Sequence, residues 1–189
     1  MMDTNTDSTI IPYCNSSRIS LWQGDVTTLS VDAIVIATNI AASDQRELGT
    51  AVITESFGLY PKYVIHAVAP IWDGSDTEER SKLLAFCYWR ALALAQKHGL
   101  KSIAFCCIGT TCVSGFPKEL AARIALLMVR KWLDMHPDAR IHVIFNVFTD
   151  IQYQLYHHYL YQIFANACYE LPESQSAKLN QLLRFCESE

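Results

Sequence analysis

The sequence of 189 residues lacks a long apolar run, a basic cluster and any internal repeat. No apolar stretch reaches the roughly 20 residues that a membrane-spanning helix needs. The first residues, Met-Met-Asp-Thr-Asn-Thr-Asp, also lack the basic and apolar regions of a secretory signal, so we expect a cytoplasmic protein without a membrane partner. Lys and Arg total 15 against 19 Asp and Glu and form no run, which argues against a nucleic-acid surface but allows a nucleotide ligand.

The seven cysteines follow neither a disulfide framework nor a zinc pattern. Their number is odd and their positions are scattered, which indicates reduced thiols. Cys106 and Cys107 are neighbours in a predicted strand and point to opposite faces, so with Cys112 they do not form a zinc site. A phosphatase would need an Arg six positions after Cys112, where the sequence has Lys118. We therefore predict no metal and no nucleophilic cysteine.

Short apolar runs alternate along the chain with stretches of helical period, which predicts an α/β protein. We expect a three-layer α/β/α sandwich with a central mixed, largely parallel sheet, between a flexible tail (residues 1–17) and a C-terminal helical extension (169–189). The domain itself covers residues 18–168. A helix capped by Thr77 ends before Gly99, and a second, over 118–135, turns Leu120, Ile124, Leu127, Met128 and Trp132 inward. Strands are predicted at 19–22, 31–39, 49–54, 62–68, 102–108 and 141–147.

The stretch from Ser102 to Pro117 combines a buried strand, a loop of small residues and a helix start. Gly109 and Gly115 bound the loop and permit unusual backbone angles. Pro117 suits the first turn of a helix. Loop amides and a helix N-terminus together favour an anion. The pattern equally fits a plain strand-to-helix connection, and both interpretations stay open.

Five short motifs occur in the order and context of the macrodomain, the ADP-ribose-binding module, and the chain resembles that family from about Ile19 to about Tyr161. The motifs are Gly24-Asp25-Val26-Thr27, Val31-Asp-Ala-Ile-Val35 with Asn39, Tyr63-Val-Ile-His-Ala-Val-Ala-Pro70, Leu83-Leu84 with Cys87-Tyr88, and Ser102-Ile-Ala-Phe105 followed by Gly115-Phe-Pro117.

The resemblance implies an adenine end of a ligand site. In the family, the Asp of the Gly-Asp turn holds the adenine amino group and the next backbone amide holds the ring; Asp25 and Val26 match these positions. A carboxylate suits an exocyclic amine because the bond is charge-assisted. Phe148 matches the family's aromatic next to the adenine. As alternatives, Asp25 is a turn or cap residue and Phe148 an ordinary core residue.

The distal half departs from the family pattern. The family's strand usually ends Val-Asn-Ala-Ala-Asn; here it reads Val35-Ile36-Ala37-Thr38-Asn39, so only Asn39 remains, and the Gly-rich loop that follows in the family is absent. The second phosphate loop is one residue longer, and Ser114 replaces its aromatic. The loop residues we expect to contact the ligand are Gly109, Thr110, Thr111, Cys112, Val113, Ser114 and Gly115.

The resemblance therefore implies a divergent macrodomain that binds ADP-ribose or a related adenine nucleotide without hydrolysing it. No catalytic residue and no cofactor are expected, because the loop that carries the family's catalytic group is missing. One alternative is a scaffold for protein interaction, such as a homodimer. Another is a hydrolase of ADP-ribosyl groups.

Overall fold

The computed structural model describes residues 11–12, 18–38, 47–110 and 115–165. These residues form a seven-stranded sheet in the order β1-β2-β7-β6-β3-β5-β4. Its strands are β1 (Ile11–Pro12), β2 (Ile19–Gln23), β3 (Ala33–Thr38), β4 (Ala51–Glu55), β5 (Tyr63–Val68), β6 (Ser102–Phe105) and β7 (His142–Val147). The predicted extension at 169–189, and the predicted tail apart from β1, lie outside the described residues.

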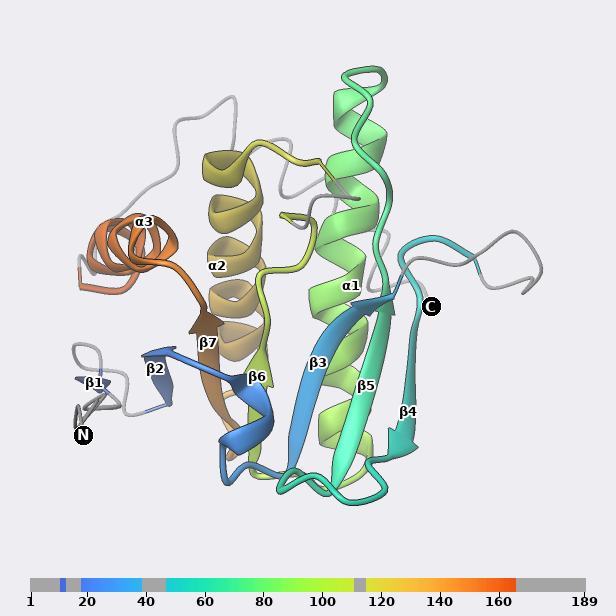
Figure 1. Cartoon of the computed structure of the whole chain (residues 1–189), viewed down its shortest axis with the longest axis vertical. Coiled ribbons are helices and arrows are strands. Elements are labelled where there is room, and N and C mark those ends of the chain that lie inside the picture. The colour runs from blue at the N-terminus through green and yellow to red at the C-terminus, as the bar shows by residue number, and fades with distance from the viewer. Residues whose placement is uncertain (1–10, 13–17, 39–46, 111–114, 166–189) are drawn as a thin grey trace, which may run out of the picture.

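The five inner strands are all parallel, and only the two outer strands, β1 and β4, pair antiparallel with their neighbours. The helices are α1 (Thr77–Lys97), α2 (Lys118–Met135) and α3 (Asp150–Leu160), with a 3-10 turn η1 (Val26–Thr28) and a π-helical turn η2 (Tyr161–Ala165). The predicted α/β class and the mixed, largely parallel sheet are confirmed. Because the inner strands are parallel, their carboxyl ends lie at one edge, the upper edge in Figure 1.

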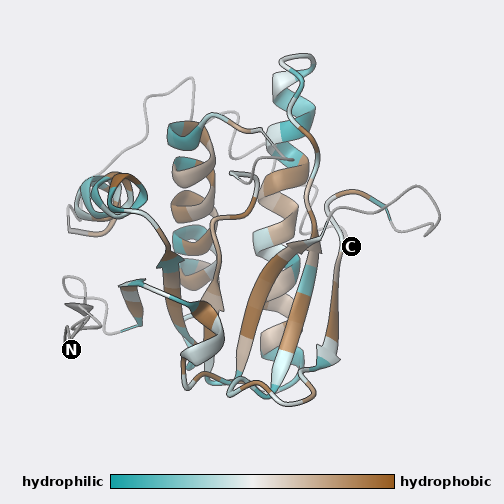
Figure 2. Ribbon diagram, viewed as in Figure 1, coloured by the Kyte–Doolittle hydropathy of each residue, from teal (hydrophilic) through white to brown (hydrophobic). Residues whose placement is uncertain are grey.

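Helices α1 and α2 lie together on one face of the sheet, and the segment that carries η1 crosses the opposite face (Figure 1). The main core fills the space between the sheet and the helices. A smaller cluster of Trp22, Leu29, Val31, Ile34, Val64, Ala104 and Ile144 lies under the segment that carries η1. Figure 2 shows β3 as hydrophobic along most of its length, whereas the first turns of α1 are hydrophilic. A strand with both faces apolar must be covered on both, which is what the two clusters achieve.

The second predicted helix has the predicted bounds, but its buried face differs from the prediction. Met128 and Trp132 are buried as expected, whereas Leu120, Ile124 and Leu127 are only half-buried. The fully buried positions include Ala121, Ala122, Ala125 and Leu126. Helix α2 packs against α1. Small side chains among the buried positions allow two helices to approach closely, because the distance between helices depends on the side chains at their contact.

Two predicted boundaries are corrected. The N-cap of α1 is Asp76, not Thr77, and its backbone is left-handed (φ 43°) with no side-chain capping bond. The preceding turn is held instead by Arg80, which pairs with the Asp73 carboxylate at 2.5 Å and donates to the Ile71 carbonyl. The strand predicted over 102–108 ends at Phe105. Beyond it, the Ile108 amide donates to the Cys106 carbonyl, which turns the chain away from the sheet.

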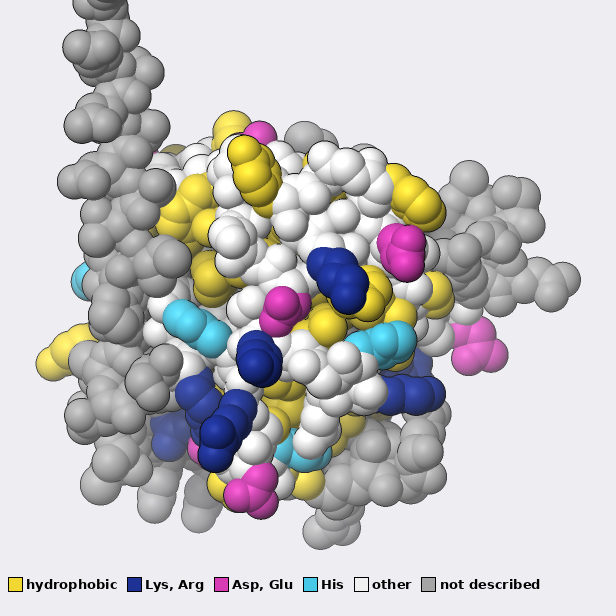
Figure 3. All heavy atoms as spheres, turned by 90° about the horizontal axis from the view of Figure 1, so that it is seen from below, with side chains coloured by type: hydrophobic (Ala, Val, Ile, Leu, Met, Phe, Trp, Pro, Cys, Tyr) yellow, Lys and Arg dark blue, Asp and Glu magenta, His cyan; other side chains and the backbone are white. Residues whose placement is uncertain are grey.

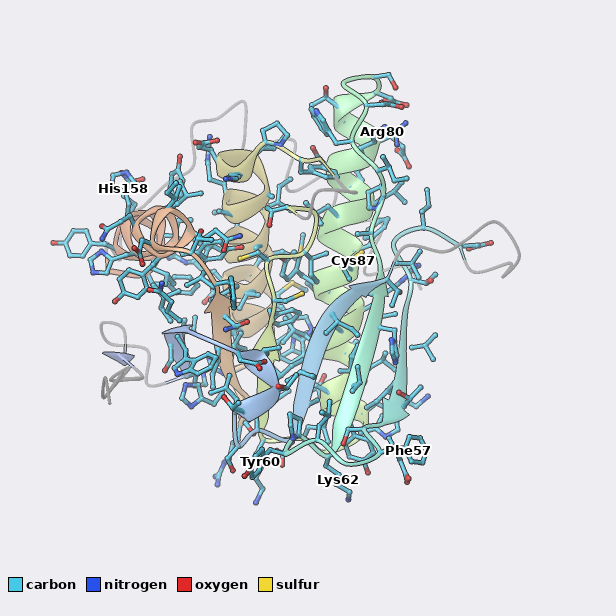
Figure 4. All side chains as sticks on the ribbon, in the orientation of Figure 1. Phe57, Tyr60, Lys62, Arg80, Cys87 and His158 are labelled. Atoms are coloured by element: carbon cyan, nitrogen blue, oxygen red, sulfur yellow. The ribbon has the colours of Figure 1, made fainter. Side chains whose placement is uncertain are left out.

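The opposite end of the molecule, at the amino ends of the parallel strands, carries scattered Lys, Arg and His side chains among hydrophobic ones (Figure 3). Figure 4 places Phe57, Tyr60 and Lys62, of the hairpin between β4 and β5, at this lower end and Arg80 at the upper end. None of the helices in the described ranges is long and apolar enough to cross a membrane.

Candidate functional site

The fold brings the described candidate residues to the carboxyl edge of three neighbouring strands. Asp25 and Val26 follow β2, Phe148 follows β7, and the loop from Gly109 follows β6. Open parallel sheets bind ligands at this edge. Five other candidates fall in unplaced segments, so their arrangement is outside the described residues: Asn39, Thr111, Cys112, Val113 and Ser114.

Asp25 is both a cap and an exposed carboxylate. Its Oδ1 accepts hydrogen bonds from the Thr27 hydroxyl at 2.7 Å and the Thr27 amide at 3.0 Å, so it caps η1 as the alternative interpretation predicted. These two bonds, the hydroxyl first, lower the pKa of the Asp25 carboxyl below its ordinary value. The side chain is therefore ionised at neutral pH. Within the described chain its Oδ2 accepts no bond, which leaves one charged acceptor for a ligand.

Val26 lies half-buried against the smaller core cluster. Its carbonyl accepts the Leu29 amide at 3.3 Å. As the first residue of η1, its own amide has no partner within the turn. A free amide directly after an ionised carboxylate is a donor and acceptor pair. That pair matches the edge of an adenine, which presents an amino group beside a ring nitrogen.

Phe148 is not a core residue: its side chain is 75% exposed. The backbone beneath it is well fixed, because Gln152 Oε1 accepts the amides of Phe148 at 3.1 Å and Thr149 at 3.2 Å. Thr149 caps α3 in return, by accepting the Gln152 amide. The core alternative for Phe148 is thereby excluded. The ring is therefore accessible to a ligand and is held on a fixed backbone.

The loop after β6 is closed at its base. The Phe116 amide donates to the Gly109 carbonyl at 3.0 Å, which brings the two ends of the loop together. Gly109 has φ +84°, and a Cβ there would lie 3.3 Å from both Leu84 Cδ1 and Phe116 Cδ2. The Thr110 hydroxyl, expected as a ligand donor, donates instead to the Cys107 carbonyl at 2.9 Å. The hydroxyl hydrogen of Thr110 is therefore engaged within the loop and stabilises its first residues.

Gly115 ends the loop next to a residue that the sequence prediction did not include. Its φ is +68°, and a Cβ there would lie 3.3 Å from the Trp72 carbonyl oxygen. The Trp72 ring packs against Phe116 with centroids 4.9 Å apart. Trp72 follows β5 and so reaches the same edge as the loop. Its place two residues after Pro70, which closes a predicted strand, was a signal available in the sequence.

Asn146 is the second missed residue, and its signal was a lone polar side chain inside an apolar strand. It is 7% exposed, and its Nδ2 donates to the Gly24 carbonyl at 2.9 Å. The Gly24 amide in turn donates to the Val147 carbonyl at 3.0 Å. The turn before Asp25 is thus attached to β7 at both of its backbone groups.

The cysteines near the loop are poor nucleophiles. Burial raises the pKa of the Cys106 thiol to about 11 and that of the Cys107 thiol to about 12, so both are protonated at neutral pH. Only the thiolate is strongly nucleophilic. In the parts of the chain that the structure places, no group of His, Cys, Asp and Glu could hold a metal ion. Cys112 falls in an unplaced segment.

Cys87 leads to a pH prediction. Cys87 is a residue of α1 (Figure 4), and its side chain faces the sheet. Its thiol donates to the carbonyl of Leu83, in the same helix, at 3.3 Å and to that of Val68, in β5, at 3.4 Å. Burial raises its pKa from 9.0 to about 12. A raised thiol pKa stabilises the fold below about pH 9, and this stability is lost as the pH rises towards about 12, by at most about 1.4 kcal/mol per pH unit.

Urea unfolding in reducing buffer should therefore show the free energy of unfolding falling less steeply above about pH 9 in Cys87→Ala than in the unaltered protein. The variant has a constant deficit at lower pH, so the slope is the quantity to compare. Parallel curves for the two proteins would contradict the assignment.

Residues 34–125 match the Macro domain family. A Protein-ADP-ribose hydrolase from Treponema medium is 38% identical over 170 residues, covering 72% of this chain and 64% of that protein. A Protein-ADP-ribose hydrolase from Staphylococcus aureus (strain COL) is 35% identical over 186 residues. The match covers 80% of this chain and 69% of that protein. The chain thus spans about two thirds of the length of these curated relatives.

Among solved structures, the Trypanosoma brucei macrodomain in complex with ADP-ribose is similar, with a TM-score of 0.67 and 32% identity over 76% of this chain and 69% of that one. The sheet order, the motifs and these relatives agree with one another. The chain is a member of the macrodomain family.

Proposed function

We propose that the chain binds ADP-ribose, or an adenine nucleotide that shares its adenosine and diphosphate, at the carboxyl edge of β2, β7 and β6. The observation that carries the proposal is the exposed ring of Phe148, which directly follows Val147, the residue that binds the turn presenting Asp25 and the Val26 amide. The Asp25 carboxylate accepts a hydrogen bond from the adenine amino group, and the Val26 amide donates one to a ring nitrogen. The phenyl ring of Phe148 covers the adenine. The loop bounded by Gly109 and Gly115 receives the diphosphate. The relative from Trypanosoma brucei was solved with ADP-ribose, which supports the choice of ligand.

We further propose that binding is not followed by hydrolysis. A general base works best with a pKa near the working pH. At this edge, hydrogen bonds lower the pKa of Asp25, mainly from the Thr27 hydroxyl, and that of Asp73, mainly from the Ser75 hydroxyl. Asp150 is engaged by Gln23 Nε2 at 2.8 Å. These described carboxylates are weak bases or already bonded, and the sequence lacks the family's Gly-rich loop.

Hydrolysis is the second candidate, because both curated relatives carry the name Protein-ADP-ribose hydrolase. Its agent would come from residues 39–46, which the structure does not place. The two candidates differ in one assay: incubation with an ADP-ribosylated protein, followed by chromatography of the released nucleotide. We expect no release above that of buffer. Release that Asn39→Ala abolishes would establish the hydrolase instead.

Binding itself is tested by titration calorimetry with ADP-ribose, ADP and AMP. We expect heat with all three, and the strongest binding with ADP-ribose, since it alone reaches beyond the diphosphate. Absence of heat with every ligand at millimolar concentration would refute the proposal.

Phe148→Ala is expected to raise the Kd for ADP-ribose about tenfold, because stacking on a base contributes about 1–3 kcal/mol. The free energy of unfolding should change by less than about 0.5 kcal/mol, since the ring is exposed. Ile151→Ala is the matched control: Ile151 is also an exposed apolar residue, one turn further along the chain on α3. An equal loss of affinity in both variants would contradict a specific role for Phe148.

A further inference from the structure

We propose that Asn146 is a positioning residue for the adenine end of the site. Through its side-chain amide it holds the turn that carries Asp25, and so it sets the affinity for the base without touching the ligand. This inference rests on the proposed function, because it concerns binding of an adenine nucleotide.

The orientation of the Asn146 amide follows from its neighbours. Its Nδ2 lies 2.9 Å from the Gly24 carbonyl oxygen and 3.5 Å from the Val147 carbonyl oxygen. Two acceptors on one side require the donor end of the amide there. Asn146 is opposite Trp22 in the parallel pair of β2 and β7, and only the pair of Gln23 and Val147 separates it from the turn. It therefore stands directly beneath the point where the chain leaves the sheet.

The turn has few other attachments. The bonds of Asp25 with Thr27 and Thr28 are internal to the turn. Among the described residues, the hydrogen bonds from Gly24–Thr28 to the sheet run to Val147 and Asn146. Removing the Asn146 donor leaves the Gly24 carbonyl held only by its covalent neighbours. The direction of the Asp25 carboxylate and of the Val26 amide then depends on one remaining hydrogen bond to the sheet and on the packing of the Val26 side chain.

The same residue also touches the base of the phosphate loop. The Cys107 thiol donates to the Asn146 carbonyl oxygen at 3.5 Å, and the Cys107 carbonyl accepts the Thr110 hydroxyl. This contact uses the backbone of Asn146, so it survives substitution of the side chain. A side-chain variant should accordingly disturb the adenine end and spare the phosphate end.

A polar side chain buried in an apolar strand needs such an explanation. The rest of β7 is apolar from Val143 to Phe145. Buried amides are retained where they satisfy a specific partner. Here that partner is a backbone carbonyl of the candidate site.

The test compares Asn146→Leu, which has a similar volume and no donor, with the unaltered protein. The probes are AMP and ribose 5-phosphate, which lacks the base. We expect the Kd for AMP to rise about tenfold, as for a lost hydrogen bond to a buried group, and that for ribose 5-phosphate to change less than about twofold. Ser20→Ala is the control: Ser20 is the other buried polar residue of the described sheet, and its hydroxyl lies 2.8 Å from His142 Nε2, away from the turn.

Asn146→Asp serves if the leucine variant does not fold. At about pH 8 its ionised carboxylate cannot donate to Gly24, and at about pH 5 a protonated fraction can, so the loss of AMP affinity should shrink on acidification. The unaltered protein is measured at both pH values. A purely structural role for Asn146 predicts no such recovery.

A double-mutant cycle with Asp25→Ala completes the test. If Asn146 acts through the turn, Asn146→Leu adds less than about a twofold further loss of AMP affinity once Asp25 is gone. Three results would each overturn the inference and leave the proposed function in place. They are additive losses of AMP affinity in the cycle, equal losses of affinity for AMP and ribose 5-phosphate in Asn146→Leu, and unchanged AMP binding in Asn146→Leu. If the unaltered protein binds neither AMP nor ADP-ribose, the proposed function is overturned first, and this inference with it.

Discussion

Trp132→Ala is expected to lower the free energy of unfolding by about 3–5 kcal/mol, the usual range for removing a buried aromatic ring. Trp132 is 1% exposed and is the largest fully buried side chain in the described part of the chain. Its ring stacks on His136 with centroids 4.2 Å apart and planes at 16°. Trp132 belongs to the main core cluster, and a packed core relaxes only partly around a cavity. Since domains are stable by about 5–15 kcal/mol, the variant should be close to unfolding.

The measurement is urea unfolding followed by circular dichroism, with the slope of the transition compared between variants to detect changes in the unfolded state. Met135→Ala, at the end of the same helix and 38% exposed, is the control and should lose less than about 1 kcal/mol. A loss of similar size in both variants would mean that Trp132 does not anchor α2.

Gly24→Ala is expected to lower the free energy of unfolding by about 2–4 kcal/mol, through overpacking and backbone strain together. Gly24 has φ +151°, and a Cβ there would lie 2.7 and 2.9 Å from two atoms of the Trp22 indole. The indole is buried in the smaller core cluster, so it cannot move away without displacing its neighbours. The turn must therefore shift, and because Asp25 is the next residue, affinity for AMP should fall as well.

Gly58→Ala separates the two causes. Gly58 also has a positive φ, +103°, but nothing lies within 4 Å of a Cβ built on it. Its substitution carries the backbone strain alone, about 1 kcal/mol, and leaves AMP affinity unchanged. Equal destabilisation in the two variants would show that the contact with Trp22 has no effect. Thermal or urea unfolding of both variants, with AMP calorimetry, makes the comparison.

The elements predicted well are those with a strong local signal. Helix α2 begins and ends where predicted, because Pro117 precedes it and the helical period of its apolar residues persists to Met135. The structure shows another local signal, on which no prediction above was based: the complete capping box of Thr149 and Gln152 before α3. Such signals act over a few residues of sequence and so can be recognised without a tertiary structure.

The predictions that failed concern contacts that residue type and period alone do not reveal. Which side of α2 is buried depends on the elements that pack against it, α1 among them. Thr77 was predicted as a cap because of its residue type, but Arg80 and Asp73 hold the preceding turn in a form that places Asp76 at the cap position. Neither outcome follows from local preference alone.

By itself, the sequence determined the α/β alternation, the family resemblance and the identity of Asp25, Phe148 and the glycine-bounded loop as candidates, because motifs and periodicity are properties of neighbouring residues. Only the tertiary structure decided that Phe148 is exposed, that the Thr110 hydroxyl turns back into its loop, and that Asn146 holds the Gly24 turn. The physical reason is sequence separation. Gly24 and Asn146 are 122 residues apart and meet only because β2 and β7 pair in one parallel register.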